Sequence, residues 1–261
     1  MSEAAYTFAI VCEADADRRI ACDLADRVLL ESERLSWIDN QEMLHSMRDW
    51  LRHDGEHFYL AWKTVKDRYE DSIKGKREWK AFGNFSGNKG KPDALTARKA
   101  LIYLELCMPR PKAVFLIRDS DGYPERKEGL EQARDEPSRR PFEVIIGVAE
   151  PCREAWVLAG FVPEEHEASK LSDEQRRLGF CPVERSHLLK PRENKQLKKG
   201  QSSTSAKAVH ANLLPNPDRE AQCWRETPLP LLRERGHGCG LTAYLDELDT
   251  RLIPLFAERP S

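Results

Sequence analysis

Acidic side chains follow two strongly apolar runs of this sequence, at the point where each run ends. Glu13 comes directly after Tyr6–Cys12, and Asp119 and Asp121 come two and four residues after a run that ends at Ile117. Carboxylates held close together repel one another, and a hard divalent cation relieves that repulsion. Mg²⁺ prefers oxygen ligands and keeps several waters, so one or two carboxylates and a phosphate suffice to bind it. The acids therefore predict a Mg²⁺ or Mn²⁺ site, if the fold brings them together.

The elements that must position these acids alternate along the chain. Buried strands are expected at Tyr6–Cys12, 113–117 and 142–148, and helices at 16–31, 93–106 and 125–135. Strands that alternate with helices are typical of a parallel sheet with crossover helices. We predict an α/β fold, with a Rossmann-like, mostly parallel sheet flanked by helices. Functional groups of such sheets gather beyond the carboxyl ends of the strands, which is where the acids lie.

Two acids after the third predicted strand extend the candidate site, and each acidic motif also has a simpler interpretation. Glu150 and Glu154 follow the run 142–148, and Glu150 is the weaker candidate of the two. An acid at the start of a helix also interacts favourably with the helix dipole, which would explain Glu154 without a metal. The segment Asp-Ser-Asp-Gly at 119–122 is common turn chemistry, because Asp and Gly favour turns for local reasons. Both interpretations stay open from the residues alone.

The length of 261 residues is enough for one large domain or for a domain with a subdomain. We predict an α/β core over residues 1–161, with a helical and basic-loop insertion at about 35–92. A helical region over 162–261 is expected to pack on this core. Within the insertion we expect a β-like piece at 35–38, helices at 41–52 and 57–71, and a mobile loop at 74–92. Asp15 is expected to cap the helix 16–31.

Charge, cysteine usage and hydropathy indicate the compartment. The formal net charge is −2, which does not by itself demand a polyanionic partner, although a basic face is compatible with it. The seven cysteines are widely spaced and form no C-x-x-C, as is typical of reduced thiols in a cytoplasm. No apolar run approaches the roughly 20 residues that span a bilayer. We therefore expect a cytoplasmic protein without a membrane partner.

The acidic motifs resemble those of the Toprim domain, which topoisomerases, primases and OLD-type nucleases share. That family has a Glu after its first strand and a D-x-D after a later one, matched here by Glu13 in VCEADAD and by Asp119 and Asp121 in FLIRDSDG. The resemblance implies that Glu13 is a general acid/base or metal ligand, and that the two aspartates bind Mg²⁺. The segment EPCREAWVLAGF also resembles a bacterial Toprim-like family of uncharacterised function, which adds Glu154 to the metal ligands. The resemblance covers about residues 6–161 and implies an inserted segment between Glu13 and Asp119.

Basic segments are candidates for holding a nucleic acid. Residues 63–99 contain eleven Lys and Arg against five acids, with five aromatic residues between 62 and 85. Residues 190–207 contain six Lys and Arg against Glu193 alone. Basic loops with aromatic residues suit phosphate contacts and base stacking, although a charged run is more often a solvated surface. The candidate phosphate contacts are Arg118, Lys89, Lys91, Lys195, Lys198 and Lys199.

We therefore predict a Mg²⁺-dependent phosphodiester-cleaving enzyme that acts on nucleic acid, with DNA favoured over RNA. The resemblance further implies a role in bacterial defence against phage beside an ATPase partner. Two alternatives stay open. One is a small-molecule phosphohydrolase or phosphotransferase, because D-x-D-G after a strand also resembles the haloacid-dehalogenase motif, which that family carries on its first strand. The other is a non-catalytic Toprim-like subunit whose basic loops bind a partner. The oligomeric state is left open.

Overall fold

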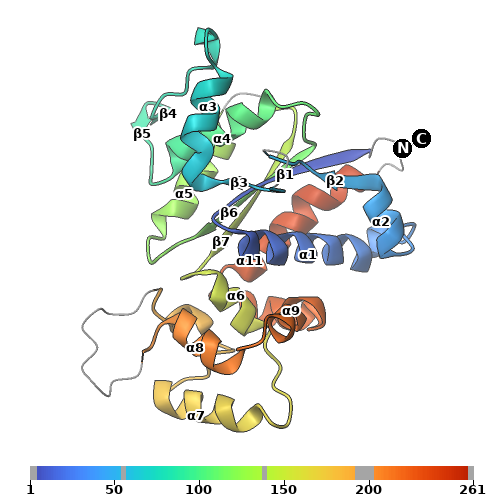
Figure 1. Ribbon diagram of the computed structural model, residues 1–261, viewed down its shortest axis with the longest axis vertical. Coiled ribbons are helices and arrows are strands. Elements are labelled where there is room, and N and C mark those ends of the chain that lie inside the picture. Colours follow the sequence, from blue (N-terminus) through green and yellow to red (C-terminus); the bar gives the residue numbers. More distant parts are fainter. Residues whose placement is uncertain (1–4, 54–56, 137–139, 192–202, 258–261) are drawn as a thin grey trace. The chain divides into compact units, whose positions relative to one another are not determined.

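The computed structural model describes residues 5–53, 57–136, 140–191 and 203–257 and contains a mainly parallel β-sheet (Figure 1). Its strand order is β2-β1-β6-β7. β1 (Tyr6–Cys12) pairs in parallel with β2 (Arg48–Trp50), β3 (Leu60–Ala61) and β6 (Ala113–Asp119). β7 (Glu143–Ala149) lies beside β6. The predicted α/β class, with a mostly parallel sheet flanked by helices, is confirmed.

The pairing of β1 with β6 sets where the two strands end. Phe8 lies opposite Ala113, and Val11 lies opposite Leu116. The residues from Phe8 to Cys12 and from Ala113 to Leu116 are buried, as expected of parallel strands that are covered on both faces. Because the strands are parallel and in register, their carboxyl ends share one edge of the sheet.

The chain divides into two compact units. The first comprises Met1–Ile117, Pro124–Gly147 and Glu247–Ser261, and the second comprises Arg118–Tyr123 and Val148–Asp246. The division therefore falls within β6 and β7, near their carboxyl ends. The predicted boundary between residues 161 and 162 stays a prediction.

The first unit holds most of the sheet and five helices of the described chain, α1 (Asp15–Glu31), α2 (Gln41–Met47), α3 (Val65–Ser72), α4 (Ala94–Glu105) and α5 (Glu125–Arg134). α4 packs against both α3 and α5, and the three lie together in Figure 1. The chain returns at its carboxyl end through a π-helix (Leu248–Leu252) that packs on α1, and a 3₁₀ turn (Ile253–Phe256) follows. Phe256 stacks on Tyr6 with ring centroids 4.2 Å apart, which ties this end to β1.

The insertion differs from its prediction in several elements. β2 and β3 occupy parts of the predicted helices 41–52 and 57–71, because these two- and three-residue strands pair along β1. A 3₁₀ turn (Glu33–Leu35) stands in place of the predicted β-like piece 35–38. Two further 3₁₀ turns are Trp62–Thr64 and Arg77–Trp79. The predicted loop 74–92 contains a hairpin of β4 (Asn84–Phe85) and β5 (Asn88–Lys89).

The start of α1 also differs from its prediction. Ala14 is the N-cap residue, and Asp15 is the first residue of the helix. Asp17, three residues after the N-cap, accepts a hydrogen bond from the Ala14 backbone N–H at 2.9 Å. A carboxylate at this position satisfies a backbone donor that the helix leaves open. The expected capping by Asp15 is therefore wrong, and Asp17 has that role.

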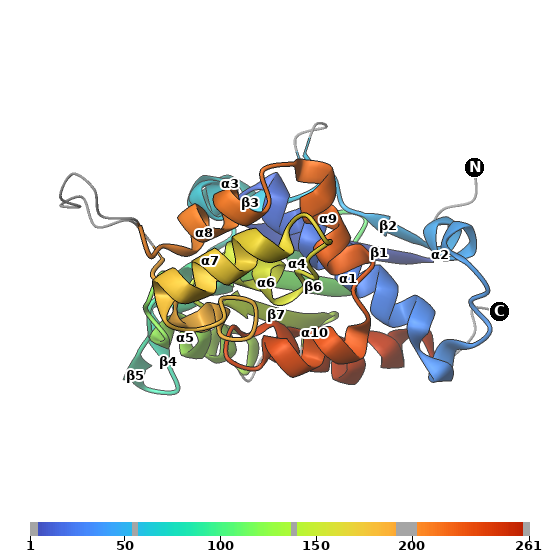
Figure 2. The same ribbon diagram turned by 90° about the horizontal axis from the view of Figure 1, so that it is seen from below.

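The second unit is helical. Its helices are α6 (Arg153–Ala159), α7 (Ala168–Leu178), α8 (Ala206–Leu213), α9 (Pro217–Arg225), α10 (Leu229–Gly236) and most of α11 (Leu241–Glu247). α6 packs against α8, α9 and α10, and α7 lies beside α8 (Figure 2). The buried Trp156 stacks on Tyr244 and donates its indole N–H to the Cys239 carbonyl at 2.8 Å. Among the described helices of either unit, none is both long and apolar enough to cross a membrane.

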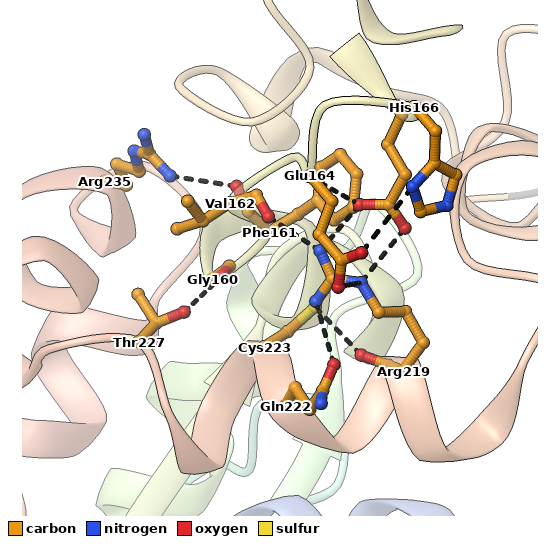
Figure 3. A network of polar contacts seen from close by, with 11 residues as sticks. Gly160, Phe161, Val162, Glu164, His166, Arg219, Gln222, Cys223, Thr227 and Arg235 are labelled. Carbon is orange, nitrogen blue, oxygen red and sulfur yellow. Dashed lines mark hydrogen bonds and ion pairs between the residues drawn. The ribbon is translucent and has the colours of Figure 1, made fainter.

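A polar network holds the chain after α6 against α9 (Figure 3). The Arg219 guanidinium donates to both carboxylate oxygens of Glu167, at 3.0 and 2.7 Å, and to the Val162 carbonyl at 2.6 Å. It also lies 5.2 Å from the centre of the Phe161 ring. Bidentate pairing of arginine with a carboxylate fixes orientation as well as distance. Arg219 therefore fixes the path of residues 161–167, and its guanidinium has a structural role.

Candidate functional site

Glu13 and Asp119, two of the acids that carry the Toprim resemblance, lie at the ends of neighbouring strands. Glu13 comes two residues after Val11, in an exposed bend before α1. Asp119 comes three residues after Leu116, the partner of Val11, and is the last residue of β6. Glu13 belongs to the first unit and Asp119 to the second. The strand pairing is thus the structural feature that relates them.

Asp121 and Gly122 are the two central residues of a turn over 120–123, as the Asp-Ser-Asp-Gly composition predicts. The Tyr123 backbone N–H donates to the Ser120 carbonyl at 2.9 Å, which closes a four-residue turn. Asp121 and Gly122 have φ angles of 52° and 79°, the left-handed conformation that Asp and Gly adopt most readily. The turn is fixed by the buried Ser120, whose backbone N–H donates to the Ala149 carbonyl at 2.9 Å. Local backbone geometry therefore accounts for the residue types at 121 and 122.

Asp119 and Glu154 both lie at the start of α6. Asp119 Oδ1 accepts a hydrogen bond from the Arg153 backbone N–H at 2.8 Å, and Glu154 is the next residue of the helix. Burial raises the pKa of the Cys152 thiol, and the negative charges of Glu154 and Asp119 raise it further. Both carboxylates therefore lie within electrostatic reach of one buried thiol, although they are 35 residues apart in the sequence.

Arg153 connects these acids to α9. Its guanidinium donates to Glu154 Oε1 at 3.4 Å and makes a short contact with Glu220 Oε1. His210 Nε2 lies 3.6 Å from the same Glu220 oxygen. The side chains of Arg153, Glu154, His210 and Glu220 are only 12–16% exposed. We call these four residues and Asp119 the Arg153 cluster.

Glu154 and Glu220 of the Arg153 cluster are held in their charged form. Burial would raise the pKa of Glu220, but the nearby His210 and the Arg153 guanidinium outweigh it and lower this pKa to about 2. Burial likewise opposes ionisation of Glu154, yet the Cys152 thiol, Arg153 and Lys207 together lower its pKa below the ordinary value. The cluster therefore keeps two nearly buried glutamates ionised at neutral pH.

The donor chemistry at the start of α6 fits Mg²⁺ or Mn²⁺. Glu154 Oε2 is buried, and no donor of the described chain reaches it with hydrogen-bond geometry. Asp119 offers further carboxylate oxygens, and oxygen ligands are what these cations prefer. Over the described residues, no three His, Cys, Asp or Glu side chains are already grouped to enclose an ion. The metal site accordingly stays a prediction.

The remaining predicted residues have different surroundings. Arg118 and Glu150 are half-buried, and Lys89 is exposed on β5. Lys91 is exposed, but its Nζ lies 3.0 Å from a Glu128 carboxylate oxygen, so an acid already neutralises much of its charge. Lys195, Lys198 and Lys199 lie outside the described residues.

Sequence reasoning missed Arg153, His210 and Glu220. Arg153 stands beside the predicted Glu154, and a basic residue next to a candidate acid is a weak signal. Glu220 lies 67 residues from Arg153, and no spacing or motif relates them. His210 formed no recognisable pair in the sequence. The packing of α6 against α8 and α9 brings these side chains together.

Comparisons with known proteins do not identify a family for this chain. No protein-family model matches the chain, and neither a curated protein nor a solved structure matches it. The Toprim resemblance accordingly stays a prediction carried by Glu13, by Asp119 and Asp121, and by the segment around Glu154.

Proposed function

We propose that this protein is a Mg²⁺- or Mn²⁺-dependent enzyme of the Toprim type that cleaves phosphodiester bonds in DNA. One observation carries most of the support. β1 and β6 are neighbouring parallel strands in register, with Val11 opposite Leu116. Glu13 comes two residues after Val11, and Asp119 comes three residues after Leu116. Acids that follow adjacent parallel strands lie where the active sites of open α/β sheets are commonly built.

The acids have two roles in this proposal. Asp119, Asp121 and Glu154 hold the cation, which when bound polarises the scissile phosphate. Glu13 transfers a proton as the general acid/base. Arg153 is a positioning residue, because its backbone N–H orients the Asp119 carboxylate and its guanidinium contacts Glu154. Preorganised ligands of this kind avoid rearrangement during the reaction.

The proposed setting is the bacterial cytoplasm, in a system directed against phage. All seven cysteines are unpaired thiols, which suits a reducing compartment. The sequence contains no G-x-x-x-x-G-K-[ST] phosphate-binding loop. A step driven by ATP would therefore depend on a separate ATPase, and we propose such a protein as the partner.

Nicking of supercoiled plasmid DNA, with and without Mg²⁺ or Mn²⁺, tests the catalytic proposal. Glu13→Gln and Asp119→Asn should each lower the rate by about 100-fold or more, because a lost proton donor or ligand typically costs that much. Glu33→Gln and Asp173→Asn remove exposed acids from the first and second units and should leave the rate unchanged. Equal cation-dependent rates in the native protein and both site variants would contradict the proposal.

The turn at residues 120–123 also favours a non-catalytic subunit, because it explains Asp121 and Gly122 without a metal. Isothermal titration with Mg²⁺ separates the two functions. Binding that Asp119→Asn weakens supports the enzyme, whereas no Mg²⁺ binding together with retained DNA binding supports the subunit. A phosphorylated Asp119 trapped with a small phosphate ester would instead indicate a phosphotransferase.

A further inference from the structure

Phe82 is exposed, unlike the other aromatic residues of the basic insertion. Trp62, Tyr69 and Phe85 are buried in the first unit, and Trp79 is half-buried. Phe82 is 63% exposed and belongs to the segment that connects α3 to the β4-β5 hairpin (Figure 1). The structure therefore reduces five aromatic candidates for stacking to one.

The backbone on both sides of Phe82 is fixed by buried groups. The Tyr69 hydroxyl donates to the Trp79 carbonyl at 3.0 Å and accepts from the Ala81 N–H at 2.5 Å. The Arg98 guanidinium contacts the Phe82 carbonyl and also donates to the Asn84 carbonyl at 3.0 Å. Tyr69 and Arg98 are themselves buried. An exposed ring on an anchored backbone loses little conformational entropy when it binds a partner.

The segment that carries this ring is strongly basic. Residues 74–91 contain six Lys and Arg against Glu78 alone, a local net charge of +5. Lys80 Nζ lies 5.9 Å from the centre of the Phe82 ring. Lys76, Arg77, Lys80 and Lys89 are all exposed and form no ion pair within the described chain. We call Phe82 and these four cations the Phe82 platform.

We infer that the Phe82 platform binds single-stranded DNA, with one base stacked on the Phe82 ring and phosphates held by the four cations. The choice of DNA as partner rests on the proposed function. A single strand is required because duplex bases already stack on one another, whereas an unpaired base offers its face to an aromatic side chain. Cations that have no acidic partner are available to phosphates.

The contributions of base stacking and of phosphate contact to binding are distinguished by comparing two oligomers. The measurements are made in EDTA, where a cation-dependent nuclease does not cleave. Fluorescence anisotropy would measure binding to oligo(dT) and to an abasic oligomer of equal length, which has the phosphates but no bases. Native protein should bind oligo(dT) about 10-fold more tightly, because one base stacks on the Phe82 ring. Phe82→Ala should remove this preference, and Phe82→Trp should retain it.

Met108→Ala is the matched control, because Met108 is an exposed apolar side chain of the same unit outside the platform. Its preference for oligo(dT) should equal that of the native protein. Equal binding of both oligomers by native protein, or an unchanged preference in Phe82→Ala, would overturn the inference. Tighter binding of duplex DNA or of oligo(U) would also overturn it. Because binding is read without cleavage, failure of the platform is distinguishable from failure of the nuclease proposal.

Discussion

Arg153 shows how one side chain can organise acids that are distant in the sequence. Its backbone N–H orients Asp119, and its guanidinium lies between Glu154 and Glu220. Removing one member of a nearly buried charge network leaves the others without compensation, which is costlier than the network's net contribution. We expect the Arg153 cluster to contribute to the stability of the second unit whether or not the protein cleaves DNA.

The pKa of Glu220 gives this cluster a predictable pH dependence. Its folded-state pKa of about 2 lies below the ordinary 4.5, so ionised Glu220 stabilises the fold above about pH 4.5. This contribution is lost as the pH falls from 4.5 through about 2. Urea unfolding should show Glu220→Gln less stable than native protein at pH 7, with a smaller difference at pH 3. Glu226→Gln, at an exposed residue that follows α9, should show neither effect. A stability difference that is constant from pH 7 to pH 3 would contradict this assignment.

At the scale of elements, the contact between α5 and the start of α4 depends on a glycine. A Cβ atom added at Gly129 of α5 would lie 1.8 Å from the Pro92 carbonyl oxygen. Alanine would gain about 1 kcal/mol of helix propensity, but overpacking costs about 1–3 kcal/mol and a backbone atom cannot turn aside. Gly129→Ala should therefore lower the free energy of unfolding, measured by urea denaturation.

Gly83→Ala is the control for this substitution. Gly83 has ordinary backbone geometry, and the nearest atom to its added Cβ is Leu95 Cδ2 at 3.9 Å. Gly83→Ala should therefore change the free energy of unfolding little. If the Gly129→Ala protein is as stable as the native one, α4 and α5 can move apart without lowering the free energy of unfolding.

The elements that the sequence predicts well are those with long apolar runs. β1, β6 and β7 lie within two residues of their predicted positions, because seven-residue buried strands have a strong local pattern. β2 and β3 have three and two residues, and pairing with β1 defines them rather than their own composition. The same reason separates Glu13 and Asp119, which end recognisable strands, from His210 and Glu220, which only tertiary packing relates.

At the scale of the whole molecule, charge is unevenly distributed. The chain has a net charge of −2, and residues 74–91 contribute +5, so the rest of the protein carries −7. Phosphates are repelled by most of this chain and attracted by its short basic segments, 74–91 and 190–207. Binding of a nucleic acid should therefore be local and strongly dependent on salt.

The salt dependence of binding can be assigned to individual lysines. For single strands, the logarithm of the binding constant falls with the logarithm of salt concentration by about 0.7 for each phosphate neutralised. Lys80→Gln should therefore reduce the slope for oligo(dT) by about 0.7 and weaken binding to the abasic oligomer as well, because it removes a phosphate contact. Lys170→Gln removes an exposed lysine of α7 in the second unit. It should leave the slope for oligo(dT) and the binding to the abasic oligomer unchanged. Equal slopes for the two variants would place the phosphate contacts outside the Phe82 platform.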